Sequence, residues 1–238
     1  MEQTSAENNI VNPVVRQYLD QLNLPQTEFL RELRAQAEQR RIPIIGRDTE
    51  ALLGSILLLA QPERILEIGT AIGYSSLYLA TILPNTQIIT VELDPDKSQE
   101  AEKHICEAGL THQIQVRTGD GIQVLRDLVQ ENTKPFDLIF IDAAKGQYQA
   151  FFQETIPLWS PEAVILSDNI LFQGVTASDR YLKSRRDRTI MNRMRSYLAW
   201  LQERKDTHTS FLPVGDGVAI TIRKESMDES IRVAGTSR

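Results

Sequence analysis

The sequence has few of the residues that build disulfides, thiolate metal sites and membrane spans. Only one cysteine, Cys106, occurs among its 238 residues. This excludes an internal disulfide framework and a zinc site made of thiolates. The longest apolar run, at 52–60, is too short to cross a bilayer. The start of the chain, MEQTSAENNI, lacks the basic-then-apolar order of a signal peptide. We therefore expect a cytoplasmic protein with no membrane contact.

Charge and composition are those of an ordinary globular protein. The chain carries 26 Lys and Arg against 32 Asp and Glu, a formal net charge of −6, and 41% of its residues are hydrophobic. These values are not typical of a disordered chain. The acidic balance argues against a general nucleic-acid coat protein, although it leaves room for a local basic patch. The length suits one α/β domain with a sizeable core.

The hydrophobic pattern predicts helices first, and then strands that alternate with helices. Helical patterns at 14–22, 28–40 and 49–59 form an N-terminal helical extension over 13–61, and the polar ends at 1–11 and 224–238 are expected to be flexible. Apolar runs predict strands at 64–68, 87–91, 114–117, 136–141 and 163–167. Helical patterns lie between them, at 74–82, 95–108, 121–130 and 147–158. No repeat or linker divides the chain, so we expect a single domain over 1–238.

The C-terminal part of the chain has a different pattern. One long helix is expected at 179–204, followed by strand-like runs at 209–213 and 218–223 with the turn sequence VGDG between them. These two runs are predicted to pair as an antiparallel hairpin at one sheet edge. The earlier strands are apolar throughout and each precedes a helix, which indicates a parallel sheet covered on both faces. The expected fold class is α/β, a doubly wound Rossmann-like sheet, mostly parallel, with a C-terminal antiparallel hairpin.

The turn after the first strand is a candidate site for an adenosine ligand. Gly69 lets the backbone turn sharply, and Gly73 would let a ligand approach the start of the next helix. A dinucleotide fingerprint would need glycine where this chain has Ala71 and Tyr74, which counts against a dehydrogenase. A tight strand-to-helix turn without any ligand is the alternative interpretation.

Two further strand ends strengthen this interpretation. Glu92 closes the second strand, where a carboxylate can accept hydrogen bonds from both hydroxyls of a ribose. The third strand ends in Gly119-Asp120-Gly121, which would place a carboxylate and open backbone beside an adenine amino group. A solvated charge at Glu92 and a plain turn at 119–121 are the alternatives. Taken together, the three strand ends suit an adenosine ligand.

The fourth and fifth predicted strands end in residues that suit a hard metal ion. Asp142 follows the fourth strand, and Asp168 and Asn169 follow the fifth. If the two strands are neighbours, their axes lie about 5 Å apart and these side chains come together. Two carboxylates and an amide oxygen suit Mg²⁺ or Mn²⁺, and the cation would remove the repulsion between the carboxylates. The alternative is that Asp168-Asn169 only caps the next segment.

Lys145 lies three residues beyond Asp142. At this position it would face the expected metal and could deprotonate or steady an anionic oxygen. The alternative is a solvated surface lysine.

Several ordered motifs resemble the cation-dependent O-methyltransferase family, which includes catechol and caffeoyl-coenzyme A methyltransferases. The motifs are LEIGTAIGYSS, FIDAAKGQYQAFF, LSDNILFQG and VGDGVAIT, and the similarity spans 41–223. Among the members of the family, the chain most resembles those of bacteria that methylate 5-hydroxyuridine in tRNA. The resemblance implies a class I methyltransferase sheet, S-adenosyl-L-methionine as donor, Mg²⁺ with Mn²⁺ as a substitute, and a homodimer.

The resemblance also implies roles for residues. Donor contacts are expected at Ile45, Glu67, Gly69, Ser75, Glu92, Asp120, Gly121 and Asp142. Metal ligation is expected from Asp142, Asp168 and Asn169, with Lys145 and Asp142 as the catalytic residues. Catechol-type relatives have bulky residues just before the lysine, where this chain has Ala143 and Ala144. We interpret this difference as a roomier pocket, which argues against a small catechol.

The resemblance implies that the acceptor is 5-hydroxyuridine at the wobble position in a tRNA anticodon loop. Its 5-hydroxyl and 4-carbonyl oxygens are adjacent like the two oxygens of a catechol, so the same metal geometry can serve both substrates. Basic residues gather near the start of the predicted long helix, at Arg180, Lys183, Arg185, Arg186, Arg188, Arg193 and Arg195. We assign RNA binding to Arg185, Arg186 and Arg188, and stacking on an unstacked uracil to Phe172. A solvated helix face and buried loop packing are the respective alternatives.

Two other functions stay open at this point. One is methylation of small catechol-like or phenolic thioester acceptors. The other is a non-catalytic module that binds adenosine or RNA.

Overall fold

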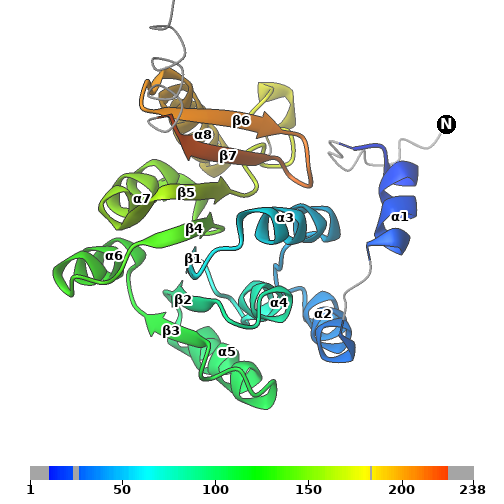
Figure 1. Cartoon of the computed structure of the whole chain (residues 1–238). Coiled ribbons are helices and arrows are strands. Elements are labelled where there is room, and N and C mark those ends of the chain that lie inside the picture. Colours follow the sequence, from blue (N-terminus) through cyan, green and yellow to red (C-terminus); the bar gives the residue numbers. More distant parts are fainter. Residues whose placement is uncertain (1–10, 24–26, 183, 225–238) are drawn as a thin grey trace, which may run out of the picture.

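The computed structural model describes residues 11–23, 27–182 and 184–224, which build one seven-stranded sheet covered by helices on both faces (Figure 1). The strands are β1 (Arg64–Ile68), β2 (Gln87–Glu92), β3 (Ile114–Thr118), β4 (Phe136–Ile141), β5 (Trp159–Ser167), β6 (Thr207–Leu212) and β7 (Val218–Arg223). Their order in the sheet is β3-β2-β1-β4-β5-β7-β6. Strands β1 to β5 pair in parallel, and β7 pairs antiparallel with both β5 and β6. The predicted fold class is confirmed.

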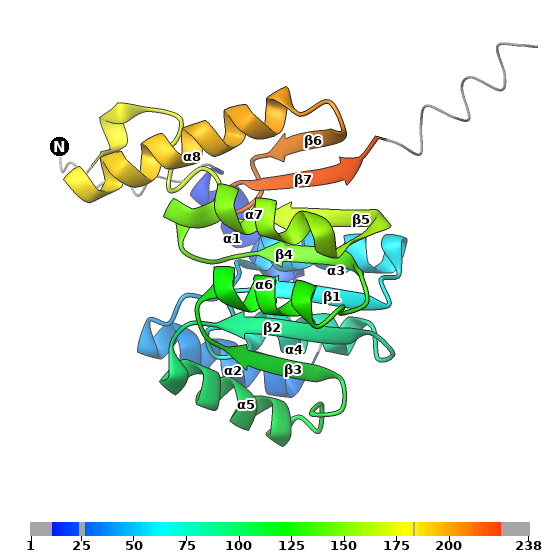
Figure 2. The ribbon, with the colours of Figure 1, turned by 90° about the vertical axis from the view of Figure 1, so that its left-hand side faces the viewer.

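Two groups of helices cover the sheet. The α-helices are α1 (Pro13–Leu22), α2 (Glu28–Arg40), α3 (Arg47–Ala60), α4 (Tyr74–Ile82), α5 (Pro95–Glu107), α6 (Gly121–Gln130), α7 (Tyr148–Thr155) and α8 (Arg185–Glu203). Short 3-10 helices are η1 (Lys145–Gln147), η2 (Ile156–Leu158) and η3 (Asp179–Tyr181). Helices α2 to α5 pack on one face, and α6, α7 and α8 pack on the other (Figures 1 and 2).

Each face of the sheet has its own hydrophobic core, because successive side chains of a strand point to opposite faces. In β1, Ile65 packs with α3 and α4, whereas Leu66 packs on the side of α6 and α7. In β4, Phe140 and Ile139 divide in the same way. Both faces of the central strands are therefore buried. This explains why their sequences are apolar throughout and do not alternate with polar residues.

The structure corrects the predicted boundary between α7 and β5. The helix predicted at 147–158 ends as an α-helix at Thr155 and continues as η2, where Pro157 occupies the first turn. Strand β5 begins at Trp159 and not at 163. Trp159 pairs with Phe136 across a register shift in β4. The intervening Pro161 is exposed and provides no backbone N–H for a ladder, so the sequence signal for a strand was lost there.

The single long helix predicted at 179–204 is wrong. The chain forms η3, leaves helical geometry at Leu182 (φ −65°, ψ 126°) and enters α8 at Arg185. The side chain of Ser184 accepts a hydrogen bond from the backbone N–H of Asp187 at 3.1 Å. Serine satisfies the unpaired N–H groups of a first helical turn, so it starts a new helix here. Lys183, one of the expected basic residues, lies outside the described residues.

The N-terminal helices differ in how they pack. Leu30, Leu33 and Ala37 of α2 are buried in the core on the α4 side of the sheet. Helix α1, in contrast, has no buried residue, and it leaves Val14 and Tyr18 exposed. In the described part of the chain, no helix is long and apolar enough to cross a bilayer.

The ends expected to be flexible, 1–11 and 224–238, fall almost entirely outside the described residues. Lys224 is an exception. Its backbone N–H donates to the carbonyl oxygen of Asp206 at 3.0 Å, so the ordered chain continues through this residue.

A buried carboxylate lies inside the sheet just before the first strand ends. Glu67 of β1 is fully buried, and its Oε2 atom accepts hydrogen bonds from the hydroxyls of Ser76 and Thr90, the latter at 2.6 Å. Burial raises the pKa of Glu67 to about 7, against the effect of these hydrogen bonds. The folded protein therefore holds a proton here at a pH at which the unfolded chain has lost it.

This shift predicts a pH-dependent stability that Glu67→Gln removes. Between pH 4.5 and 7 the folded state binds more protons than the unfolded state, so the free energy of unfolding falls as pH rises through this window. The limit of the effect is about 3 kcal/mol. The free energy of unfolding should be measured with denaturant at pH 5 and at pH 8. From pH 5 to pH 8 the wild type should lose about 3 kcal/mol more than the glutamine variant, whose side chain is always neutral. Identical pH dependence of the two proteins would contradict the assignment.

Candidate active site

A cavity of about 410 Å³ opens beyond the carboxyl ends of the parallel strands. In doubly wound sheets this is the edge at which ligands bind. Its lining brings together most of the residues predicted from the sequence for ligand and metal binding. They are Ile45, Gly69, Ser75, Glu92, Asp120, Gly121, Asp142, Lys145 and Asn169. Asp168 and Glu67 do not line the cavity, and Glu67 lies below it, inside the sheet. The expected contact between Glu67 and the donor is therefore wrong, and we assign Glu67 to support of the turn above it.

The turn from β1 into α4 depends on one glycine. Gly69 has a φ of 106°, and a Cβ atom there would lie 2.0 Å from the carbonyl oxygen of Asp142. Only glycine fits, so the turn and the end of β4 lie in direct contact. Gly73 does not have its predicted role. A Cβ atom there would meet Ala101 of α5 at 3.3 Å, and Gly73 does not line the cavity, so it serves packing between helices.

Glu92 lies at the end of β2 with both carboxylate oxygens held by the backbone. Oε2 accepts a hydrogen bond from the N–H of Ala71 at 2.7 Å, and Oε1 accepts one from the N–H of Asp94 at 3.0 Å. The carboxylate is thereby fixed against the β1–α4 turn at the cavity wall. Each oxygen keeps a lone pair, so the group can accept the two hydroxyls of a ribose. This preformed acceptor fits the ribose of an adenosine ligand.

Asp120 and Gly121 form the wall at the start of α6. Oδ1 of Asp120 caps the helix by accepting the N–H of Gln123 at 3.1 Å, and the residue is exposed. A Cβ atom at Gly121 would lie 2.8 Å from the ring of Phe151, so a side chain would crowd the cavity. Asp120 can therefore cap α6, as a plain turn would predict, and still have the expected ligand role.

The ends of β4 and β5 place the predicted metal ligands side by side. Ile141 pairs with Ser167, so Asp142 and Asp168 leave the sheet at the same level. Nδ2 of Asn169 lies 3.3 Å from Oδ1 of Asp142, and the N–H of Asn169 donates to Oδ1 of Asp168 at 2.7 Å. The spatial relation expected from the sequence is present.

The electrostatics of this cluster favour a bound cation. Burial raises the pKa of Asp142, and burial together with the neighbouring charge of Asp142 raises that of Asp168 well above its usual range. The positive charge of Lys145 lowers both pKa values and so acts against the effect of burial. Two buried carboxylates with this little compensation are costly when ionised, and a divalent ion offsets that cost.

The donor set fits a hard divalent cation. Asp142 and Asp168 supply carboxylate oxygens and Asn169 supplies an amide oxygen, which together with water oxygens suit Mg²⁺ or Mn²⁺. Among residues that the structure describes, no group of three His, Cys, Asp or Glu side chains could hold a metal. The predicted third ligand, the amide oxygen of Asn169, is not of these residue types.

Lys145 and Phe172 lie together at the rim of the cluster. Nζ of Lys145 is 3.4 Å from Oδ1 of Asn169 and 5.5 Å from the centre of the Phe172 ring. Asn169, Phe172 and Gln173 all have left-handed backbone angles, with φ of 57°, 47° and 53°. Such angles strain side-chain-bearing residues and are common where surrounding structure fixes a functional loop. Phe172 is half-buried, and so is accessible in part to a flat ligand.

Two residues that hold this loop and cluster were not identified from the sequence. The hydroxyl of Thr49 in α3 lies 3.5 Å from Oδ1 of Asp168. Asp216, in the turn between β6 and β7, accepts the N–H of Gln173 at 2.5 Å, and its carbonyl oxygen accepts the N–H of Leu171. The sequence predicts a hairpin turn at VGDG and a family motif in VGDGVAIT, but no contact for Asp216. Its position between two strand candidates gave no signal that it contacts the loop after β5.

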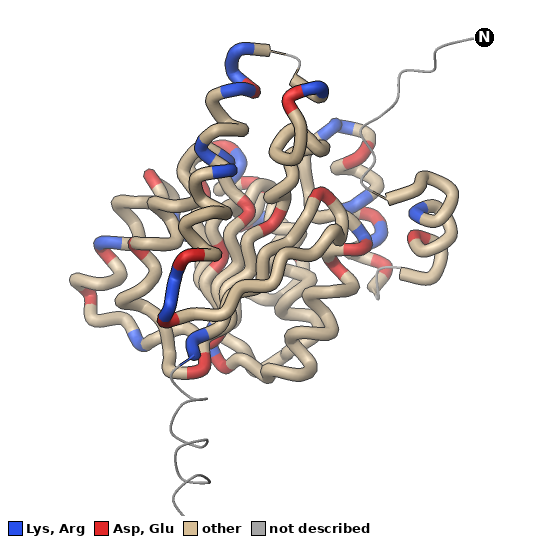
Figure 3. Tube along the Cα trace, turned by 90° about the horizontal axis from the view of Figure 1, so that it is seen from above, with Lys and Arg blue, Asp and Glu red and all other residues tan. Residues whose placement is uncertain are grey.

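The basic residues predicted to bind RNA lie at the beginning of α8. Arg185, Arg186 and Arg188 are exposed, and Figure 3 shows Lys and Arg gathered at this end of the helix. The beginning of α8 extends past the carboxyl edge of the sheet (Figure 2). Two other basic residues are engaged within the protein. Arg195 pairs with Asp179 at 2.9 Å, and Arg193 donates to the carbonyl oxygen of Gly146 at 3.4 Å.

Comparison with known proteins identifies the family. The O-methyltransferase family profile matches residues 21–224. A catechol O-methyltransferase of Niastella koreensis is 46% identical over 117 residues, which are 49% of this chain and 53% of the relative. The chain thus spans about half the length of that curated relative.

Solved structures extend the similarity to nearly the whole chain. A Staphylococcus aureus protein assigned as a caffeoyl-CoA O-methyltransferase has a TM-score of 0.83 and 31% identity, covering 88% of this chain and 99% of its own. An O-methyltransferase of Bacillus cereus, in complex with SAH, has a TM-score of 0.77 and 26% identity, covering 89% and 97%. The chain belongs to the O-methyltransferase family of the catechol and caffeoyl-CoA type.

Proposed function

We propose that the protein transfers the methyl group of S-adenosylmethionine to a hydroxyl oxygen that has a second oxygen beside it. The observation that carries this proposal is the cluster of Asp142, Asp168 and Asn169 next to a cavity with a preformed ribose acceptor, Glu92. SAH in the Bacillus cereus relative is the demethylated form of this donor, which supports the choice of cofactor.

The reaction is a direct displacement. The acceptor oxygen forms a bond to the methyl carbon while the carbon–sulfur bond breaks, and the electron pair of that bond stays on sulfur. When bound, a divalent cation supplies positive charge that favours the deprotonated acceptor. The chain holds both reactants in line, which supplies much of the acceleration. Lys145 lies at the rim, where it can take the hydroxyl proton or hold the resulting negative charge.

The proposed acceptor is 5-hydroxyuridine at the wobble position of the tRNA anticodon loop, converted to 5-methoxyuridine. Two hollows support an extended, anionic acceptor. One hollow is lined in part by Lys145, Gln147 and Arg193. Lys145 and Gln147 also line the active-site cavity. The other is lined by residues that include Arg185 and Arg188 and shares Asn192 with the first. Among the described residues, neither lining contains an acidic side chain, which suits the phosphates of a single strand.

A second candidate acceptor is a small catechol-like compound or a phenolic thioester. The names of the Niastella koreensis and Staphylococcus aureus relatives favour it. The small side chains of Ala143 and Ala144, which line the cavity, favour the larger acceptor.

Transfer assays separate these functions. Purified protein is incubated with the donor, with Mg²⁺ added back after chelation, and with an anticodon stem-loop that carries 5-hydroxyuridine or with 3,4-dihydroxybenzoate or caffeoyl-CoA. The proposal expects methylation of the stem-loop, dependent on the metal and at least 100-fold more efficient than that of either small acceptor. Preference for a small acceptor would overturn the tRNA assignment alone. Binding of donor and RNA with no transfer to any acceptor would indicate a non-catalytic module.

Removing one carboxylate should abolish metal binding without unfolding the protein. Asp168→Ala is expected to weaken Mn²⁺ binding by at least 100-fold in titration calorimetry, because it removes a ligand and half of the carboxylate charge. Since the lost group is a buried carboxylate beside Asp142, the metal-free variant should melt no lower than the wild type. Glu162→Gln, at an exposed site on β5, is the matched control. Wild-type affinity in Asp168→Ala would refute the metal assignment.

Neutralising the basic end of α8 should weaken binding of the stem-loop and its dependence on salt. The triple variant Arg185→Gln, Arg186→Gln, Arg188→Gln is expected to reduce the slope of log affinity against log salt by about 2, for three lost phosphate contacts to a single strand. The control replaces Lys103 of α5, Arg126 of α6 and Lys134 after α6, which are also exposed. Equal slopes in both triple variants would show that this end of α8 does not bind RNA.

We also propose that the protein is a homodimer, supported by the exposed apolar side of α1. Val14, Tyr18 and Leu22 recur at helical spacing and are 75%, 62% and 63% exposed. Light scattering on the full chain should show a dimer that Tyr18→Asp dissociates and Gln17→Asp does not, because Gln17 lies away from the apolar side. A monomeric wild type would contradict this proposal.

A further inference from the structure

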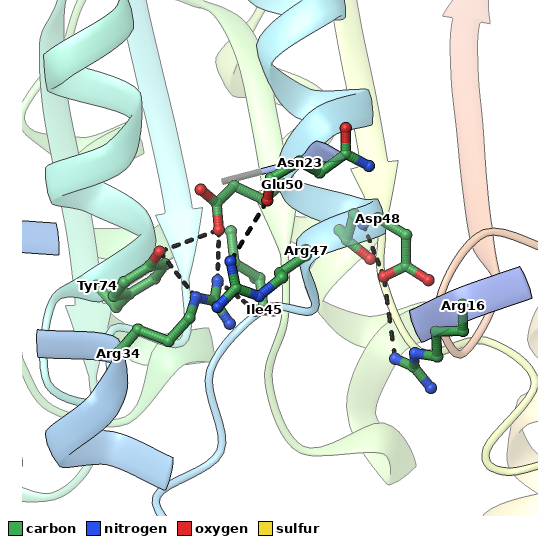
Figure 4. A network of polar contacts seen from close by, with 9 residues as sticks. Arg16, Asn23, Arg34, Ile45, Arg47, Asp48, Glu50 and Tyr74 are labelled. Atoms are coloured by element: carbon green, nitrogen blue, oxygen red, sulfur yellow. Dashed lines mark hydrogen bonds and ion pairs between the residues drawn. The ribbon is translucent and has the colours of Figure 1, made fainter. Parts of the chain in front are cut away.

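A buried arginine connects the N-terminal helices to the active-site cavity. Arg34 of α2 is 5% exposed and reaches three elements (Figure 4). Its Nε donates to the hydroxyl of Tyr74 in α4, and its Nη2 donates to the carbonyl oxygen of Ile45, both at 3.1 Å. Nη2 also forms an ion pair with Glu50 of α3. Tyr74 closes the network by donating to the same carboxylate at 3.0 Å.

The contact with Ile45 falls on the segment 42–46, which we call the wall segment. Pro43, Ile44 and Ile45 line the cavity, and the segment belongs to no helix or strand. Its first N–H donates to the carbonyl of Ala37, and its last carbonyl accepts the N–H of Glu50. Arg34 holds the carbonyl between these two points. The side chain thus fixes the part of the segment that faces the cavity.

The opposite contact of Arg34 is also at the cavity. Tyr74 is the first residue of α4, and both it and Ser75 line the cavity. The guanidinium lies over the Tyr74 ring, 4.5 Å from its centre. Arg34 therefore determines the separation between the wall segment and the first turn of α4, on which the predicted donor contacts Ile45 and Ser75 lie.

We propose that Arg34 is a positioning residue for the methyl donor. It acts through the carbonyl of Ile45 and the hydroxyl of Tyr74 and does not itself line the cavity. This inference rests on the proposed function, in which the cavity holds the donor. A lysine cannot replace the arginine, because a single ammonium on a flexible stem does not reproduce the planar fork that reaches three acceptors.

The chemistry of the network explains why so large a polar group is buried. Arg34 and Glu50 neutralise one another, and removal of one partner alone would leave a buried charge unpaired. A nonpolar pair could hold the helices together equally well. What it could not supply is the hydrogen bond to the Ile45 carbonyl. The requirement for arginine therefore comes from the wall segment and not from helix packing.

Titration calorimetry with SAH and amide hydrogen exchange test this proposal. Arg34→Lys keeps the charge opposite Glu50, and Arg34→Met keeps the aliphatic stem. We expect the Kd for SAH to rise about tenfold in both, while the acceptor KM at saturating donor stays within twofold of wild type. The amides of Ile42 and Glu50 donate to the carbonyls of Ala37 and Gly46 at the two ends of the wall segment. In the donor-free protein these two amides should exchange at least tenfold faster, with those of Ile139 and Phe140 in β4 unchanged.

The control is Arg31→Met, at an exposed arginine on the same helix, which should match the wild type in every measurement. A lower melting temperature with unchanged SAH Kd and unchanged exchange at Ile42 and Glu50 would show a purely structural role and overturn the inference. Should Arg34→Met fail to fold, Arg34→Lys carries the test. Failure of the wild type to bind SAH would overturn the proposed function, and this inference with it.

Discussion

The active site depends on the parallel register of β4 and β5. Ile141 pairs with Ser167, so the residues that follow, Asp142 and Asp168, are brought to one point at the edge of the sheet. The sheet buries both carboxylates; burial raises both pKa values, and the charge of Asp142 raises that of Asp168 further. Two buried carboxylates destabilise the folded sheet when they are ionised and their charge is not compensated. A bound divalent cation would offset this cost.

The rest of the structure shapes the surroundings of that pair. The turn at Gly69 lies against the backbone of Asp142, which brings the β1–α4 connection and the fixed carboxylate of Glu92 to the same edge. From the other side, Asp216 holds the loop that carries Phe172. The N-terminal helices supply the remaining wall through Arg34. Elements from both ends of the chain are thus needed to complete one cavity.

The sequence was informative where burial and local turn chemistry coincide. Apolar runs that end in Asp142 and in Asp168-Asn169 predicted both the strands and the closeness of these side chains, since a strand buried on both faces is visible as a continuous apolar run in one segment. The Arg34–Glu50 pair was not predicted, because nothing local to either helix indicates a buried partner 16 residues away. Gly73 was misinterpreted for a related reason, as glycine serves helix packing and ligand approach equally well. The break before α8 depends on one capping serine within an otherwise helical pattern.

The most direct test of the account is a crystal structure of the protein grown with Mn²⁺ and SAH, with the metal located by its anomalous scattering. The account predicts one strong peak bound by Asp142, Asp168 and the amide oxygen of Asn169, with the sulfur of SAH in the adjoining cavity and its ribose on Glu92. A structure with SAH bound but with Lys145 filling the space between the two carboxylates, and no metal peak there, would contradict it.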